Sequence, residues 1–89
     1  MRRVYGYTIS AEADEAAFQK ACGRVARYLP DWNKNALLTD VDGSLIQTYH
    51  KDDRTVDVFN DYEIDAVFVD AEIRLDDLFG TPTKIYTKE

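Results

Sequence analysis

One stretch of the chain, residues 11–29, carries apolar side chains at the spacing of an α-helix, and no other stretch of comparable length does. The stripe of a 3.6-residue period is formed by Phe18, Cys22, Val25 and Leu29. Ser10 is suited to cap the start of this helix, and Pro30 marks its end. A chain of 89 residues with one long helix must build the rest of its core from strands.

Short apolar runs separated by turn residues make up most of the remaining chain. Strands are predicted at Val4 to Ile9, Ala36 to Val41, Ser44 to His50, Arg54 to Phe59, Ile64 to Val69 and Lys84 to Thr87. Turns are predicted at Asp42-Gly43, Lys51 to Asp53 and Asn60-Asp61, and a single helical turn at Leu75 to Phe79. We therefore predict one α+β domain, residues 1–89, with the order β-α-β-β-β-β. One helix packs on one face of a mostly antiparallel, four- to five-stranded sheet.

The Asp42-Gly43 pair predicts the register of the first hairpin, because a two-residue type I′ turn needs positive φ at both central positions. Val41 then lies opposite Ser44, Thr39 opposite Ile46, and Leu37 opposite Thr48. That face carries no charge, so we place the helix on it. A helix is about 10–12 Å wide, whereas four or five strands span roughly 15–20 Å. The segment from Leu75 to Phe79, a second copy of the chain or a partner must cover the remainder.

Acidic residues are concentrated in one part of the chain. The net charge is −6, and residues 52–77 hold ten acidic and two basic side chains. Direct binding to nucleic acid is not expected, because that binding depends on lysine and arginine. A basic protein partner is favoured instead.

Other features of composition limit the cellular setting. Cys22 is the only cysteine, so no internal disulfide forms. No run approaches the ~20 apolar residues of a membrane span. Arg2 and Arg3 are followed by acidic residues from Glu12 onward and not by the apolar stretch of a signal peptide, so a cytoplasmic protein is expected.

A row of carboxylates is the first candidate site. Asp61, Glu63 and Asp65 alternate along the chain and would project from one face of a strand about 6.6–6.8 Å apart, a spacing similar to that of nucleic-acid phosphates. Small acidic proteins include DNA mimics and immunity proteins. We assign the binding surface to Asp57, Asp61, Glu63 and Asp65; the alternative is a solvated face whose charges keep sheet edges from pairing.

A second candidate site lies at the predicted hairpin. The segment from Ala36 to Leu45 includes Asp40-Val41-Asp42-Gly43-Ser44 and resembles the first motif of haloacid dehalogenase-like phosphatases. The resemblance covers ten residues and implies a nucleophile at Asp40, an acid/base at Asp42 and a magnesium ion. It implies an acidic pair at Asp76-Asp77 and a lysine at Lys84. That family needs a parallel sheet with helices after the motif, and a hairpin with an Asp-Gly turn has the same sequence.

The remaining reactive or aromatic residues have simpler interpretations. Cys22 lies on the helix stripe and is expected to be a small core residue. His50 is the only histidine, so no nucleophile–histidine pair can be argued. Trp32 is expected to pack at the helix end. Tyr5 and Tyr7, next to two arginines, form either a strand with an aromatic core face or a base-stacking stripe.

The sequence thus predicts a non-enzymatic interaction protein that binds a basic partner through a carboxylate-rich sheet surface, of an inhibitor, immunity or DNA-mimic type. It predicts no catalytic residue, cofactor or metal site, and leaves self-association as a homodimer open. A magnesium-dependent phosphate hydrolase and a small regulatory or ligand-binding module are the alternatives.

Overall fold

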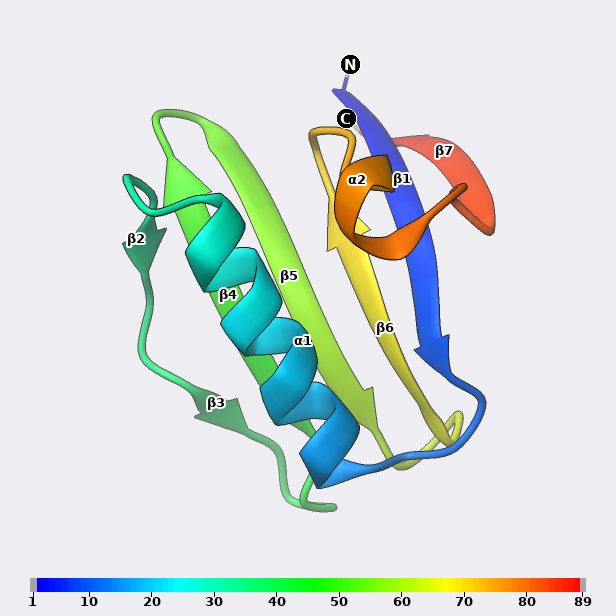
Figure 1. The fold of residues 1–89 in the computed structure, drawn as a ribbon. Coiled ribbons are helices and arrows are strands. Elements are labelled where there is room, and N and C mark those ends of the chain that lie inside the picture. The colour runs from blue at the N-terminus through cyan, green and yellow to red at the C-terminus, as the bar shows by residue number, and fades with distance from the viewer. Residues whose placement is uncertain (1, 89) are drawn as a thin grey trace.

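The computed structural model describes residues 2–88, and it places two helices on one face of an antiparallel sheet (Figure 1). The elements are β1 (Arg2–Ser10), α1 (Glu15–Tyr28), β2 (Asn33–Lys34), β3 (Leu38–Thr39), β4 (Leu45–Lys51), β5 (Arg54–Asp61), β6 (Ala66–Ala71), α2 (Asp76–Phe79) and β7 (Lys84–Lys88). The predicted α+β class is confirmed. None of the helices in this part of the chain is long and apolar enough to cross a membrane.

The strands are ordered β2-β4-β5-β6-β1-β7, and β3 pairs with the same edge strand, β4, as β2 does. Neighbouring strands are antiparallel throughout the described residues. The sheet has more strands than the four to five predicted, because β2 and β3 are two-residue strands that add to its edge. The first strand of the chain, β1, enters the sheet between β6 and β7.

The helix α1 begins four residues later than predicted, and its cap is Asp14 rather than Ser10. The Asp14 carboxylate accepts hydrogen bonds from the amides of Ala16 and Ala17. The preceding segment is tied to the β5–β6 end of the sheet, where Asn60 accepts from the Asp14 amide. The Ser10 hydroxyl instead bonds to the backbone of Glu12, at a bend before the helix, so it does not cap the first turn.

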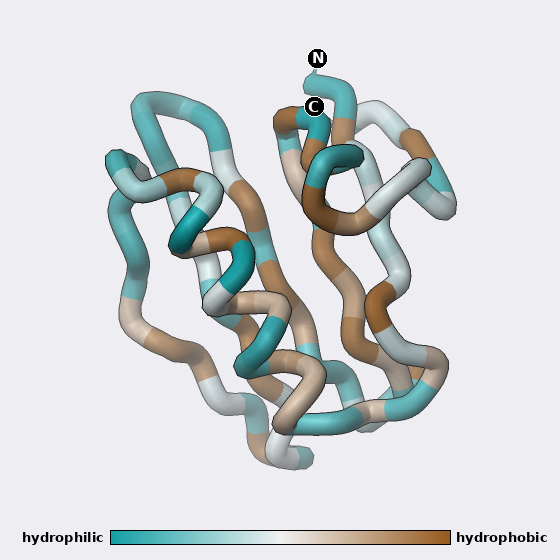
Figure 2. Tube along the Cα trace, viewed as in Figure 1, coloured by the Kyte–Doolittle hydropathy of each residue, from teal (hydrophilic) through white to brown (hydrophobic). Residues whose placement is uncertain are grey.

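The core lies between the two helices and the sheet. Figure 2 shows hydrophobic stretches along β5 and β6, the strands at its centre. From α1 the buried residues are Phe18, Ala21, Cys22 and Val25, and from the central strands Val56, Val58, Val67, Val69 and Ala71. The short helix α2 covers the part of the sheet that α1 does not reach: Leu75 is fully buried, and the rings of Tyr7 and Phe79 lie 5.8 Å apart. Of the three covers considered from the sequence, the Leu75–Phe79 segment is thus the one that folds back over the helix side.

The hairpin at Asp42-Gly43 forms, but its predicted register is wrong by one residue. Leu38 lies opposite Ile46, and Thr39 opposite Leu45. The loop has three residues, because the Gly43 amide donates to the Asp40 carbonyl and Gly43 adopts a left-handed φ of 88°. A one-residue shift exchanges the two faces of a strand.

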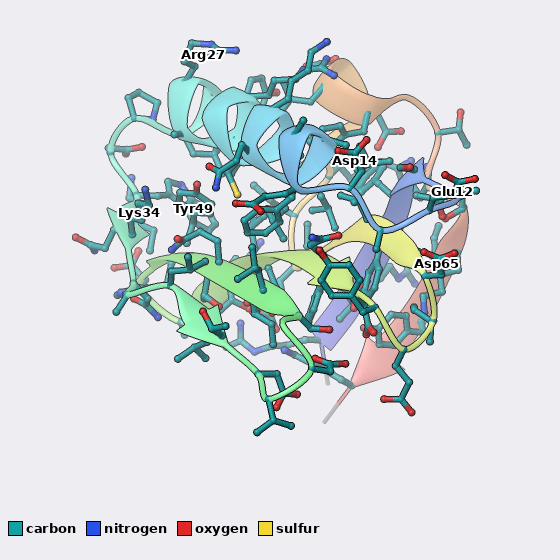
Figure 3. The ribbon with its side chains drawn as sticks, turned by 90° about the horizontal axis from the view of Figure 1, so that it is seen from below. Glu12, Asp14, Arg27, Lys34, Tyr49 and Asp65 are labelled. Carbon is teal, nitrogen blue, oxygen red and sulfur yellow. The ribbon has the colours of Figure 1, made fainter. Side chains whose placement is uncertain are left out.

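The face of β4 that was assigned to the helix for its lack of charge is also the wrong one. Leu45, Gln47 and Tyr49 point toward the helices, and the Tyr49 hydroxyl donates to the carbonyl of Cys22 (Figure 3). Ile46 and Thr48 lie on the other face, which no helix covers.

Candidate interaction surface

An apolar row crosses the face of the sheet opposite the helices. Strand register places four side chains side by side, one each from β3, β4, β5 and β6: Leu38, Ile46, Phe59 and Phe68. The rings of Phe59 and Phe68 are stacked, with centroids 4.5 Å apart and planes 12° apart. Leu38 is 60% exposed, and the other three are half-buried. Hydrophobic residues thus remain accessible on this face, as in interaction sites.

An acidic row runs beside the apolar one. Asp57 on β5 is directly opposite Asp70 on β6. Each carboxylate receives one hydrogen bond from a hydroxyl: Thr48 donates to Asp57 at 2.5 Å, and Tyr86 donates to Asp70 at 3.0 Å. Burial, together with the hydrogen bond and charge of Asp70, raises the pKa of Tyr86 to about 12, so this phenol stays protonated at neutral pH. We call the apolar and acidic rows together the open face: Leu38, Ile46, Phe59, Phe68, Thr48, Asp57 and Asp70.

A hollow of about 190 Å³ lies at the β1 side of the open face. Its floor is Gly6 on β1, and Phe68, Asp70, Ile64 and Lys84 stand around it. A larger residue at the floor would displace the Lys84 side chain, because a Cβ there would lie only 2.8 Å from Cγ of Lys84. The missing side chain lets residues of β7 reach across β1 toward β6.

The carboxylates predicted from the sequence do not lie in one row. Residues 62–65 form the turn between β5 and β6, so the strand predicted from Ile64 to Val69 begins later, at Ala66, and the predicted turn at Asn60-Asp61 is wrong. The Asp61 carboxylate accepts from the amides of Glu63 and Ile64, and Asp65 has a positive φ of 56°. Aspartate favours such turns because its short side chain bonds to the nearby backbone.

Each of the four predicted site residues therefore has a different position. Asp57 lies in the middle of the open face, and Asp61 at its end, in register with Ala66. Glu63 is exposed in the turn, and Asp65 accepts a hydrogen bond from the amide of Ala13, near the start of α1 (Figure 3). Their assignment to binding stays a prediction, but the prediction that three of them share one strand is wrong.

Asp70 was missed from the sequence, although a signal for it existed. The strand was predicted to end at Val69, whereas β6 continues to Ala71, two residues further. The alternation of side chains places Asp70 on the same face as Phe68, and the pairing with β5 then brings it beside Asp57.

The residues of the phosphatase-like motif form the exposed tip of the β3–β4 hairpin. The Asp42 carboxylate accepts from the amide of Ser44, and this hydrogen bond lowers its pKa. Asp40 bonds to the amide of Val41. The antiparallel sheet contradicts the parallel arrangement that the resemblance implies.

The other residues implied by that resemblance are used elsewhere. Asp76 accepts from the hydroxyl of Tyr7 and pairs with Arg74, and Asp77 accepts from Tyr28. Within residues 2–88, no three histidine, cysteine, aspartate or glutamate side chains are grouped to hold a metal ion.

The remaining candidates have structural roles. Cys22 is buried, and burial raises the pKa of its thiol, as expected for a core residue. Trp32 packs against the core as predicted. Tyr7 is buried and Tyr5 partly so, and Arg2 pairs with Asp53. The aromatic core face is thus confirmed.

Comparisons of the chain with protein-family models, curated proteins and solved structures found no match. The fold and the open face define a small α+β protein in which one side of the sheet forms the core and the other presents an apolar row beside a pair of carboxylates.

Proposed function

We propose that this protein is a non-enzymatic interaction module that binds a basic protein partner through its open face. The observation that carries the proposal is the position of Asp57 and Asp70, two opposed carboxylates, beside the stacked rings of Phe59 and Phe68. Aromatic side chains at the centre of an interface supply most of its binding energy, and flanking charges supply specificity and a faster encounter.

The charges of the open face favour a cationic partner over a second copy of the chain. Two chains of net charge −6 repel each other, and face-to-face pairing would bring four carboxylates together. A lysine or arginine placed between Asp57 and Asp70 would relieve the repulsion between them. An inhibitor or immunity protein that covers a basic site is the sharper form of this proposal. The phosphate-like spacing that suggested DNA mimicry is absent from the β5–β6 turn.

Two charge-reversal variants test the proposal. Asp57→Lys changes the open face, and the new lysine can form a cross-strand pair with Asp70, so the fold should be kept. Glu12→Lys makes the same change in net charge at an exposed position before α1 (Figure 3). A partner captured from a lysate should be retained by the wild type and Glu12→Lys, and lost by Asp57→Lys and by the wild type at high salt.

The comparison between the two variants decides the outcome, because capture by the wild type alone says nothing about the surface. Equal loss in both would show a nonspecific effect of net charge and contradict the proposal. Equal retention in both would place binding elsewhere on the protein. Circular dichroism of each variant checks that the fold is intact.

A further inference from the structure

The hollow beside the open face contains a carboxylate oxygen that lacks a partner. Tyr86 donates to Oδ2 of Asp70, but Oδ1 is buried and has no hydrogen-bond partner among the described residues. A buried polar atom without a partner costs free energy, and such atoms are rare in folded proteins. Asp70 therefore has one acceptor position that no donor among the described residues fills in this structure, and the Lys84 stem lies beside it.

The size and walls of the hollow indicate what kind of group fits. Its volume of about 190 Å³ is below the roughly 300–1,000 Å³ of pockets for small molecules, so one side chain suits it better than a metabolite. Phe68 and Ile64 provide apolar walls, and Thr8 and Thr83 provide two hydroxyl oxygens 3.2 Å apart. The occupant should have an apolar stem and a cationic end with several donors.

We propose that this hollow receives one arginine side chain of the partner, whose guanidinium donates to Oδ1 of Asp70 and stacks on Phe68. This inference rests on the proposed function and names the residue type that the open face recognises. Arginine fits better than lysine, because its planar group both stacks on aromatic rings and presents donors in several directions. The bond from Tyr86 keeps the Asp70 carboxylate oriented for this contact.

Lys84 covers the hollow when no partner is bound. Its stem crosses Gly6, and its ammonium lies 5.1 Å from the centre of the Tyr86 ring. No ion pair within 4 Å joins Lys84 to Asp70 in the described residues. Since Lys84 is exposed on the edge strand β7, its side chain can move away when a partner binds. Its positive charge nevertheless opposes the approach of a cationic group. Lys84→Gln should therefore strengthen arginine binding.

The test uses the whole protein and three short capped peptides, Gly-Arg-Gly, Gly-citrulline-Gly and Gly-Glu-Gly, titrated into the labelled chain and followed by NMR. Citrulline has the shape of arginine without its charge. We expect the arginine peptide to shift the amide signals of Gly6, Phe68 and Asp70, and to bind about tenfold or more tightly than the citrulline peptide. Asp70→Asn should remove that difference, while Lys84→Gln should increase it.

Several results would overturn the inference. The arginine peptide could leave these signals unchanged, bind equally well to Asp70→Asn, or be matched by citrulline. A response to the glutamate peptide alone would mean that Lys84 binds an anion there. The wild-type comparison of the three peptides needs no variant, so a folding defect in Asp70→Asn would not prevent a decision.

The failure of this inference can be separated from the failure of the proposed function. If the partner captured by the wild type is lost by Asp57→Lys but kept by Asp70→Asn, the open face binds without an arginine in the hollow. If Asp57→Lys keeps the partner, the proposed function fails whatever the peptides show.

Discussion

Asp57 and Asp70 lie directly opposite each other on β5 and β6, so two carboxylates meet at the middle of a sheet face that no helix covers. Like charges at opposed positions destabilise a sheet. Each carboxylate is held by one hydroxyl donor, from Thr48 or Tyr86. The pair is therefore expected to lower the stability of the sheet.

Removing one of these charges should stabilise the protein. Asp57→Asn keeps an oxygen that accepts from Thr48 and removes the repulsion, so the free energy of unfolding should rise by about 0.5 kcal/mol. Urea unfolding measures it, and the gain should shrink at high salt because salt screens the pair. Glu12→Gln, far from the pair, serves as the control and should show no such gain. Lower stability of Asp57→Asn at low salt would contradict the prediction.

Removal of the Asp14 cap of α1 should destabilise the protein. Asp14→Ala leaves the amides of Ala16 and Ala17 without their acceptor, so the free energy of unfolding should fall by about 1 kcal/mol. Ser10→Ala is the matched control, since the Ser10 hydroxyl bonds only to the backbone of Glu12 among the described residues. Denaturant unfolding of both variants would refute this assignment if Ser10→Ala were the more damaging.

The hydroxyl of Tyr7 should be essential for holding the segment that contains α2 on the sheet. It accepts from the buried amide of Leu75 at 2.7 Å and donates to Asp76 at 2.7 Å. Tyr7→Phe removes both bonds and leaves the amide unpaired, so we expect a loss of about 2 kcal/mol in thermal or denaturant unfolding. Tyr62→Phe removes a hydroxyl from an exposed tyrosine and should change little. Equal effects in the two variants would argue against this bond.

Lowering the pH should reduce the free energy of unfolding, because Glu72 becomes protonated. Burial by itself raises the pKa of Glu72, but hydrogen bonds from Thr55 and Lys88 outweigh it, so the pKa lies below its usual value. A lowered folded-state pKa means that the stabilisation is complete above the unfolded pKa of about 4.3 and is lost as the pH falls through the folded value.

Glu72→Gln tests this dependence. The variant should be less stable than the wild type at pH 7, and the difference should shrink as the pH falls below about 4.3. Unfolding curves measured between pH 3 and pH 7 would show it. Glu63→Gln, at an exposed turn position, should follow the wild type at every pH. A difference between Glu72→Gln and the wild type that stays constant with pH would contradict the pKa direction.

Part of the open face could be predicted from the sequence. Asp57 was assigned to binding from the charge pattern, and the structure places it on the open face. The hollow was not predicted, because it depends on Gly6, Asp70 and Lys84 meeting across three strands. Strand order is set by long-range pairing, and local patterns carry no information about it.

The sequence by itself determined the α+β class, the apolar stripe of α1 and most of the strands, since these follow from local periodicity and turn residues. Tertiary structure decided the register of the β3–β4 hairpin, the cap of α1 and the face of the sheet that the helices cover. A shift of one residue costs little in local propensity but reverses every side chain of a strand. Burial of Tyr49 and the anchoring of Asp14 to Asn60 therefore selected among arrangements that the sequence pattern alone could not distinguish.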